Sequence, residues 1–243
     1  MVVNDIQPVA NLREISLEHL KNGDQTEAAN LLAACQEDGV FYLNLKHSDG
    51  SDGELLHESA SIYHLAKQLF NLPEEEKMQY DIDLFGDMKV NGYKPVGRNF
   101  GGIRSNKDGF ESYAIAKDTI LALDPLASQH PHPQPIAAAL PLLRAFTTSI
   151  ATATAAILAS LSTSLAFPAA AGFHHRHRTL NRPSPDLLRL LKYPAQPAHE
   201  RGAPQAPHTD LGTLTVLFAS GDGLQRQAPR TGAEWRLAAE LRA

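Results

Sequence analysis

A chain of 243 residues with 43% hydrophobic and 20% charged side chains is long enough to bury a core, so we expect a globular chain and not a disordered one. Its single cysteine, Cys35, excludes an internal disulfide and any cysteine-only metal site, and we expect a reducing, cytoplasmic location. The N-terminal residues show no basic stretch followed by an apolar run, so we expect no secretion signal. The net charge of -5 excludes the large basic field that nucleic-acid binding requires.

The two halves of the chain differ in charge. Residues 1–120 carry 11 Lys or Arg against 20 Asp or Glu, whereas residues 121–243 carry 11 against 7. Ten of the 11 basic residues in the second half are arginines, whose planar guanidinium pairs with carboxylate or phosphate through two hydrogen bonds. This half therefore suits a small anionic ligand, although solvated loops explain its charge equally well.

Helix and strand patterns alternate in the first half. The predicted elements, in chain order, are a helix over residues 26–38, a strand over 40–45, a helix over 53–72 and strands over 89–97 and 110–118. Gly39 and Pro73 are positioned to end the two helices. The Gly-rich stretch GRNFGGIRSNKDG separates the last two strands, and the whole half is predicted to be a mixed α/β region.

A proline-rich stretch, residues 124–135, precedes the longest predicted helix. Four prolines in twelve residues cannot sustain a helix or a strand ladder, so this stretch, with His130 and His132, is predicted to be a linker. Apolar residues at four- and seven-residue steps then predict one long amphipathic helix from Leu142. Nine serines and threonines between residues 145 and 167 favour a helix of a soluble protein over a membrane span.

The second half contains two predicted strands on either side of a proline-containing loop. Residues 186–194 are predicted as a strand closed by Pro194, and PHTDLGTLTVLF, residues 207–218, as a strand rich in β-branched residues. Alternate residues of a strand point the same way, so His208 and Asp210 would face one cavity. An imidazole and a carboxylate suit the facial triad of non-haem Fe(II) oxygenases, which leaves open positions on the metal. A His and an Asp bonded to backbone in a turn explain the same spacing.

The order of several motifs resembles a known enzyme family. The segments LLRLLKYP, PHTDLGTLTVLF and GDGLQ, followed by Trp235, resemble the isopenicillin N synthase-like Fe(II)/2-oxoglutarate-dependent dioxygenases in order and spacing. The segments ACQEDGVFYLNL, AKQLFNLPEEEKMQY, NGYKPVG and DGFESYAI resemble the N-terminal region of that family. The resemblance covers nearly the whole chain, and this ordered set is much more specific than one H-x-D pair.

The resemblance implies an α+β, mainly β fold. This fold would be an incomplete double-stranded β-helix of the jelly-roll type, with an N-terminal α/β region and a long flanking helix. It divides the chain into an N-terminal dioxygenase region, residues 1–120, a linker and long helix, residues 121–183, and a partial β core, residues 184–243.

The same resemblance assigns roles to five residues. His208 and Asp210 would be two metal ligands, and Tyr193 would contact the carboxylate of 2-oxoglutarate. Tyr93 and Arg98 lie in a region that borders substrate in the family, although a buried tyrosine and a surface arginine also have structural explanations. No separate catalytic side chain is assigned, because the metal carries the difficult chemistry.

The implied cofactors are Fe(II), 2-oxoglutarate and O2. The implied reaction is the hydroxylation, desaturation or related oxidation of a small molecule in specialised metabolism, coupled to oxidative decarboxylation of 2-oxoglutarate. Leu191 stands where many relatives carry an asparagine that makes a further contact with the co-substrate. We expect a small-molecule substrate and no nucleic-acid or membrane partner.

Part of the family site is expected to be missing. No His occurs in the 33 residues after Asp210. The family places its third ligand, a distal His, later in the sequence, followed by an R-x-S or R-x-T pair whose Arg binds 2-oxoglutarate. We therefore expect a C-terminally truncated member with an open sheet edge that favours self-association. The alternatives are a catalytically inactive remnant that binds a partner and, without supporting spacing, a zinc hydrolase that uses the same pair.

Overall fold

The structure is a computed structural model that describes residues 9–100, 107–123, 130–177, 179–195, 205–221, 223–227 and 235–238. The chain divides into two compact units. The first unit contains residues 1–56, 152–177 and 216–243, and the second unit contains residues 57–151 and 178–215. Each unit combines separate stretches of sequence. The predicted division into three consecutive regions, with boundaries at residues 120 and 183, therefore stays a prediction.

The first unit contains two small sheets and several short helices. Strands β2 and β3 pair in parallel, and β1, β8 and β7 form the other sheet in that order. The elements are β1 (Val9–Ala10), β2 (Glu14–Ser16), α1 (Leu17–Lys21), α2 (Gln25–Ala33), η1 (Ala34–Asp38), β3 (Tyr42–Asn44), η4 (Ala169–Ala171), α8 (Phe173–Arg176), β7 (Gln225–Gln227) and β8 (Trp235–Ala238). Strand β3 confirms the strand predicted over residues 40–45.

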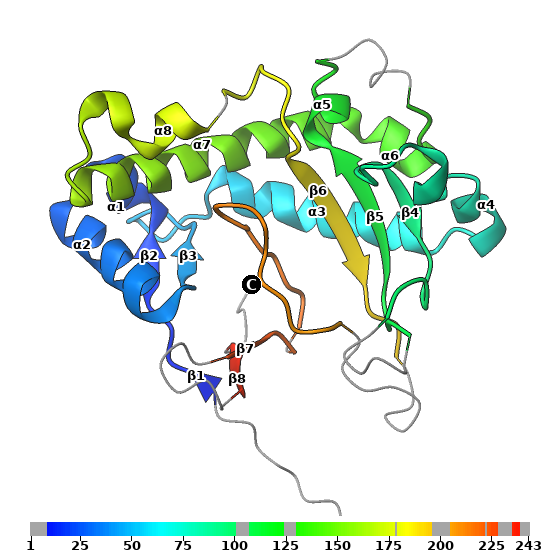
Figure 1. Cartoon of the computed structure of the whole chain (residues 1–243), viewed down its shortest axis with the longest axis horizontal. Helices are drawn as coiled ribbons and strands as arrows, with labels where there is room; N and C mark the ends of the chain where they lie inside the picture. The colour runs from blue at the N-terminus through cyan, green and yellow to red at the C-terminus, as the bar shows by residue number, and fades with distance from the viewer. Residues whose placement is uncertain are drawn as a thin grey trace, which may run out of the picture. The chain divides into compact units, whose positions relative to one another are not determined.

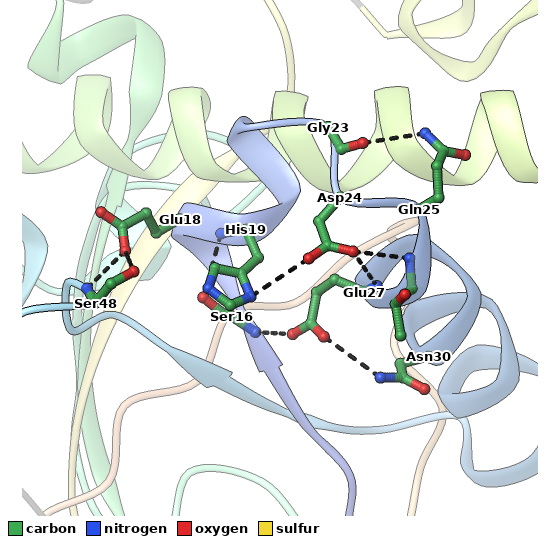
Figure 2. A network of polar contacts seen from close by, with 10 residues as sticks. Ser16, Glu18, His19, Gly23, Asp24, Gln25, Glu27, Asn30 and Ser48 are labelled. Carbon is green, nitrogen blue, oxygen red and sulfur yellow. Dashed lines mark hydrogen bonds and ion pairs between the residues drawn. The ribbon is translucent and has the colours of Figure 1, made fainter.

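Side-chain caps explain where the first two helices begin (Figure 2). The Ser16 hydroxyl accepts a hydrogen bond from the His19 amide at 3.2 Å, at the start of α1. The Asp24 carboxylate accepts hydrogen bonds from the amides of Thr26 and Glu27 at 2.8 and 3.2 Å, at the start of α2. These bonds satisfy amides that have no partner within the first turn of a helix.

Helix α2 continues into η1, a π-helical turn, before the chain leaves the helix. Gly39 follows with a φ of 69°, in the left-handed region that glycine adopts without steric cost. Its amide donates a hydrogen bond to the Ala34 carbonyl at 3.0 Å. The helix predicted over residues 26–38, with Gly39 at its end, is confirmed.

The second unit carries an antiparallel sheet in the order β4-β5-β6 (Figure 1). The elements of this unit are α3 (Glu54–Phe70), α4 (Glu74–Met78), η2 (Ile82–Leu84), β4 (Gly92–Lys94), β5 (Glu111–Ala116), α5 (Lys117–Ile120), α6 (Gln134–Ala138) and β6 (Leu187–Lys192). Helix α3 begins, and α7 (Leu140–Ser164) ends, in residues of the first unit. The helix predicted to end at Pro73 and the strands predicted over residues 89–97, 110–118 and 186–194 are confirmed as α3, β4, β5 and β6.

The β4-β5-β6 sheet has two chemically different faces. One row across the sheet consists of Tyr93, Tyr113 and Leu190, and all three side chains are buried. The adjacent row, which begins at Lys94 and ends at Leu191, points to the other face because side chains alternate along a strand. We call the face of Tyr113 the packed face and the face of Leu191 the open face, although on the open face only the residues of β6, such as Leu191, are exposed, and Lys94 and Ser112 are buried.

Helix α7 confirms the long helix predicted from Leu142 onward. Its buried side chains recur three, four or seven positions apart, as on one side of a helix, and include Leu143, Phe146, Ala153, Ile157 and Leu161. Among the described residues it is the one helix long and apolar enough to cross a membrane, with a mean hydropathy of 1.4. Core helices of soluble proteins meet the same criteria, so the absence of a membrane partner stays a prediction.

The strand predicted over residues 207–218 is wrong, because this segment forms no strand in the structure. β-Branched residues favour a strand only where a neighbouring strand supplies hydrogen bonds and a surface for packing. Leu211 is fully exposed and Leu217 is 48% exposed, so the segment lacks such a surface among the described residues.

His130 and His132 pack within the second unit instead of lying in an exposed linker. Nδ1 of His132 lies 2.9 Å from the Tyr113 hydroxyl, on the packed face of the sheet. The His130 ring packs edge-on against Phe85 and His132, with ring centroids 4.1 and 5.3 Å apart. Burial lowers the pKa of both imidazoles, and for His132 burial together with the neighbouring His130 lowers the pKa from 6.5 to about 4.

Acid is expected to destabilise the second unit through this histidine pair. Unfolding returns the pKa of His132 to 6.5, so between pH 6.5 and about 4 the unfolded chain binds a proton that the folded chain does not. The stability is therefore present above pH 6.5 and is lost as the pH falls to about 4. The loss is at most about 3.5 kcal/mol, because the two pKa values differ by about 2.5 and one pKa unit corresponds to about 1.4 kcal/mol. Urea unfolding at about pH 7 and pH 4.5 measures it.

A variant without the titrating ring isolates this effect. His132→Asn keeps a hydrogen-bond acceptor for Tyr113, and its stability should fall less than that of the wild type between the two pH values. His64→Asn, at an exposed position of α3, is the control and should keep the wild-type pH dependence. Equal pH dependence in His132→Asn and the wild type would contradict this origin of acid sensitivity.

Candidate functional site

Tyr193 follows the last residue of β6 and continues the open face of the sheet. Its ring lies 5.4 Å from that of Phe110, the residue before β5. Its hydroxyl donates a hydrogen bond to Gln205 Oε1 at 2.9 Å. The residue is 50% exposed, and burial of the remainder raises the pKa of the phenol, so the hydroxyl stays a proton donor at neutral pH.

His208 and Asp210 lie side by side in the segment that begins at Gln205. Nε2 of His208 is 3.2 Å from Oδ1 of Asp210, and both side chains are about half exposed. Nδ1 of His208 lies 2.9 Å from the Ala206 carbonyl oxygen, and with that tautomer it donates a hydrogen bond to it. Because Gln205 is bonded to Tyr193, one short segment connects this pair to the end of β6.

The positions of Nε2 and Oδ1 fit one divalent metal ion. Imidazole nitrogen and carboxylate oxygen bind zinc at about 2.0–2.2 Å, so two such atoms at about 90° around a metal lie about 3 Å apart. The observed distance of 3.2 Å between His208 and Asp210 is close to that value. A metal-ligating imidazole commonly donates its second N–H to a backbone carbonyl, and Nδ1 of His208 lies 2.9 Å from the Ala206 carbonyl oxygen, within reach of such a bond.

In one tautomer of His208 the hydrogen-bonding pattern suits a cation between these side chains. When Nδ1 carries the only proton of His208, Nε2 presents a lone pair toward the Asp210 carboxylate. Two electron-rich atoms 3.2 Å apart repel each other unless a proton or a metal ion lies between them. When His208 is protonated, the two side chains form an ion pair. When a metal ion replaces that proton, Nε2 of His208 and the Asp210 carboxylate can both bind the metal.

No group of three or more His, Cys, Asp or Glu side chains suited to a metal ion occurs among the described residues. The pair therefore supplies one imidazole and one carboxylate, and the other positions of an octahedral ion are left to other ligands. The third protein ligand implied by the family resemblance is a distal His, and the 33 residues after Asp210 contain no His.

Tyr93 is buried in the packed face and belongs to a network around Glu111. The Tyr93 hydroxyl donates to Glu111 Oε2 at 2.8 Å, Lys77 Nζ donates to the same oxygen at 2.6 Å, and Lys192 Nζ lies 3.2 Å from Oε1. Burial raises the pKa of Glu111, but these three donors outweigh it and hold the pKa below its usual range. These are structural contacts, and the place of Tyr93 beside substrate stays a prediction.

Arg98 anchors the loop after β4. Its guanidinium forms ion pairs with Asp81 and Asp83, with Nη1 3.1 Å from Asp81 Oδ1. The hydrogen bonds from Arg98 hold the pKa of Asp81 below its usual range. These contacts fix the loop, and a role of Arg98 beside substrate stays a prediction.

A buried ion pair, for which the sequence offers no signal, fixes the two ends of the same loop. Lys94 Nζ donates to Asp108 Oδ2 at 2.6 Å and to the Phe110 carbonyl at 2.7 Å, and it lies 3.9 Å from the centre of the Phe110 ring. Asp108 is 2% exposed and also accepts the Gly97 amide at 2.7 Å. Burial lowers the pKa of Lys94, and the Asp108 carboxylate opposes that effect. Nothing in the local periodicity indicates that these two charges meet.

Comparison with protein families identifies the family of the chain. A family model described as the N-terminal region of the non-haem dioxygenase in morphine synthesis matches residues 8–134, just over half of the chain. The chain belongs to this family of non-haem dioxygenases. The matched region includes β4 and β5, whereas His208 and Asp210 lie outside it.

Fungal proteins are among the relatives of this chain. It is 33% identical over 224 residues to a 2-oxoglutarate-dependent dioxygenase of Gibberella zeae, and the match covers 92% of this chain and 64% of the relative. It is 31% identical over 237 residues to oxidoreductase vrtI of Penicillium aethiopicum, with 96% and 53% covered. It is 29% identical over 222 residues to the 2-oxoglutarate-dependent dioxygenase gloE of Glarea lozoyensis, with 90% and 62% covered. The chain thus spans between about half and two thirds of the length of these relatives.

Two solved structures have a similar fold. The crystal structure of a full-length Neurospora crassa protein in complex with alpha-KG matches with a TM-score of 0.71 and 21% identity, covering 98% of this chain and 72% of that one. A putative 2OG-Fe(II) oxygenase family protein from Caulobacter crescentus matches with a TM-score of 0.70 and 22% identity, with 95% and 70% covered. At these identities the comparison establishes the fold, in which helices accompany several sheets.

Removing the Glu111 carboxylate is expected to destabilise the second unit strongly. Glu111→Ala leaves the buried ammonium group of Lys77 without its carboxylate, and an unpaired buried charge costs about 3–5 kcal/mol. Urea unfolding should show a loss of that size. Glu75→Ala, at an exposed position of α4, is the control and should change the stability by about 0.5 kcal/mol or less. A loss of less than about 1 kcal/mol in Glu111→Ala would contradict the importance of the network.

Metal binding is expected to depend on both members of the His208–Asp210 pair. His208→Ala and Asp210→Ala should each weaken the binding of Co(II) at least about tenfold, because each removes a direct ligand. Titration with Co(II), followed by visible absorption, measures the affinity. His57→Ala, which removes an exposed histidine of α3, should leave it unchanged. Wild-type affinity in either site variant would exclude that residue as a ligand.

Proposed function

We propose that this chain is the Fe(II)- and 2-oxoglutarate-binding part of an oxygenase that oxidises a small organic molecule with O2. The observation that carries the proposal is the 3.2 Å separation between His208 Nε2 and Asp210 Oδ1, with Nδ1 of His208 bonded to the Ala206 carbonyl. Relatives named 2-oxoglutarate-dependent dioxygenases support it. We place the substrate in specialised metabolism and the protein in the cytoplasm.

The sheet of the second unit is, in this proposal, part of a double-stranded β-helix. The antiparallel order β4-β5-β6 suits one wall of a jelly roll, with the open face directed to its interior. Residues 1–120 would then form the N-terminal region, residues 121–183 the linker and flanking helix, and residues 184–243 part of the β core.

His208 and Asp210 would hold Fe(II), and Tyr193 would donate a hydrogen bond to a carboxylate of 2-oxoglutarate. When bound, the metal supplies the activation of O2 and couples substrate oxidation to the decarboxylation of 2-oxoglutarate to succinate and CO2. In the structure the Tyr193 hydroxyl donates to the neutral amide oxygen of Gln205. With 2-oxoglutarate bound, the hydroxyl would donate to its charged carboxylate instead and form a stronger hydrogen bond. Leu191 offers no polar contact and would keep this part of the site apolar.

The Gly-rich loop between β4 and β5 would border the substrate. The ion pairs of Arg98 fix its first residues, and the Lys94–Asp108 pair joins its two ends. Tyr93 and Arg98 would therefore act on substrate binding through the position of the loop, since their polar atoms already have partners.

A second candidate function fits the edge of the sheet. β6 is at one edge of the described sheet, and its Leu187 and Leu191 are 38% and 37% exposed. An edge strand with exposed leucines can pair with another chain, so a non-catalytic protein that binds a partner or self-associates is the alternative. A single monomeric species in light scattering would count against this alternative.

Anaerobic addition of Fe(II) and 2-oxoglutarate is expected to produce a visible charge-transfer absorption, followed by succinate when O2 is admitted. Tyr193→Phe should weaken 2-oxoglutarate binding about tenfold or more, the effect of one charge-assisted hydrogen bond, and leave Fe(II) affinity unchanged. Tyr63→Phe is the matched control, because the Tyr63 hydroxyl has no partner among the described residues. A wild-type protein that shows neither absorption nor succinate would refute the proposed function.

A further inference from the structure

Arg189 lies on the open face of the β4-β5-β6 sheet. It stands opposite Ala114, and it precedes Leu191 and Tyr193 by two and four residues, so alternation along β6 directs these three side chains to one face. Arg189 is exposed, and its guanidinium has no hydrogen bond or ion pair with any described residue.

The neighbouring lysines of the sheet already have acceptors. Lys94 Nζ has three oxygen acceptors within 3.2 Å, including the Asp108 carboxylate, so all three of its N–H bonds are used. On the packed face, Lys192 pairs with Glu111. Of the three cationic side chains of this sheet, Arg189 is the one that has no acceptor among the described residues.

The surroundings of Arg189 favour an anion. Asp108 compensates the charge of Lys94, whereas no described carboxylate compensates that of Arg189. The charge of Arg189 also reaches Lys94, where it adds to burial in lowering the pKa of that lysine. Leu187 and Leu191, whose side chains are exposed, stand two residues before and after Arg189 on the same strand face. A carboxylate bound beside them would be partly shielded from water, which strengthens its attraction to the cation.

We propose that Arg189 is a specificity residue that binds the carboxylate of an organic-acid substrate, whose apolar part lies along Leu187, Leu191 and Tyr193. A guanidinium and a carboxylate match through two parallel hydrogen bonds, which fixes the orientation of the acid as well as its charge. This inference deepens the proposed function and rests on it for the position of the reacting centre. The second half of the sequence is rich in arginine and suits a small anionic ligand. This proposal assigns the binding of that ligand to Arg189.

The spacing on β6 separates this carboxylate from that of 2-oxoglutarate. Tyr193 stands four residues after Arg189, about 13 Å along a strand that rises about 3.3 Å per residue. Leu191 lies between them on the same face. Because the apolar side chain of Leu191 separates the two polar side chains, they suit two different ligands. The co-substrate would bind at Tyr193 and the substrate acid at Arg189.

Calorimetric titration of the metal-free protein with 3-phenylpropionate and with 3-phenylpropionamide tests this inference. The two probes have nearly the same shape and differ in charge. The wild type should bind the acid at least about tenfold more tightly than the amide, and Arg189→Gln should remove that preference. Arg189→Lys should keep part of it, because lysine keeps the charge and loses the bidentate geometry. Arg182→Gln, which removes an exposed arginine outside the sheet, should keep the whole preference.

Three results would overturn the inference. The first is equal affinity of the wild type for acid and amide, and the second is an acid preference that survives in Arg189→Gln. The third is a loss of about tenfold in 2-oxoglutarate affinity in Arg189→Gln with Fe(II) present, which would assign the arginine to the co-substrate. Failure of the proposed oxygenase chemistry is distinguishable, because it appears as missing succinate while the metal-free titration is unaffected.

Discussion

The buried carboxylate of Glu111 is the constraint on which the sheet of the second unit depends. Glu111 stands on β5 and accepts hydrogen bonds from Lys77 of α4, Tyr93 of β4 and Lys192 of β6. A carboxylate buried without partners would cost several kcal/mol, so α4 and the three strands must come together for this charge to be compensated. Side-chain chemistry thus fixes the arrangement of the strands in addition to the backbone hydrogen bonds.

The arrangement of the strands determines which side chains lie on the open face. With Lys192 bonded to Glu111 on the packed face, the alternation of β6 directs Leu191 and Tyr193 to the opposite face. Tyr193 in turn donates a hydrogen bond to Gln205, at the start of the segment that carries the metal-binding pair. A structural ion-pair network on one face therefore positions the proposed co-substrate and substrate contacts on the other.

Helices and strands with strong periodicity can be predicted from this sequence, and so can the helix ends at Gly39 and Pro73, where local chemistry decides. The strand over residues 207–218 is wrongly predicted, because a run of β-branched residues encodes a propensity and not the neighbouring strand that it requires. The ion pair between Lys94 and Asp108 joins residues that no local pattern relates, so only the folded loop shows it. Buried polar contacts of this kind depend on tertiary packing, which a single sequence does not display.

His208 and Asp210 are predictable as a pair, but the secondary structure predicted around them is wrong. The strand predicted to carry them is absent, and in the irregular segment observed Nε2 and Oδ1 lie 3.2 Å apart. The most direct measurement is a crystal structure of the protein grown anaerobically with Mn(II) and 2-oxoglutarate, with the metal located by anomalous scattering. We predict a manganese peak bonded to His208 Nε2 and the Asp210 carboxylate, with 2-oxoglutarate beside Tyr193. A metal peak elsewhere, or none at saturating Mn(II), would contradict the assignment of this pair as the metal site.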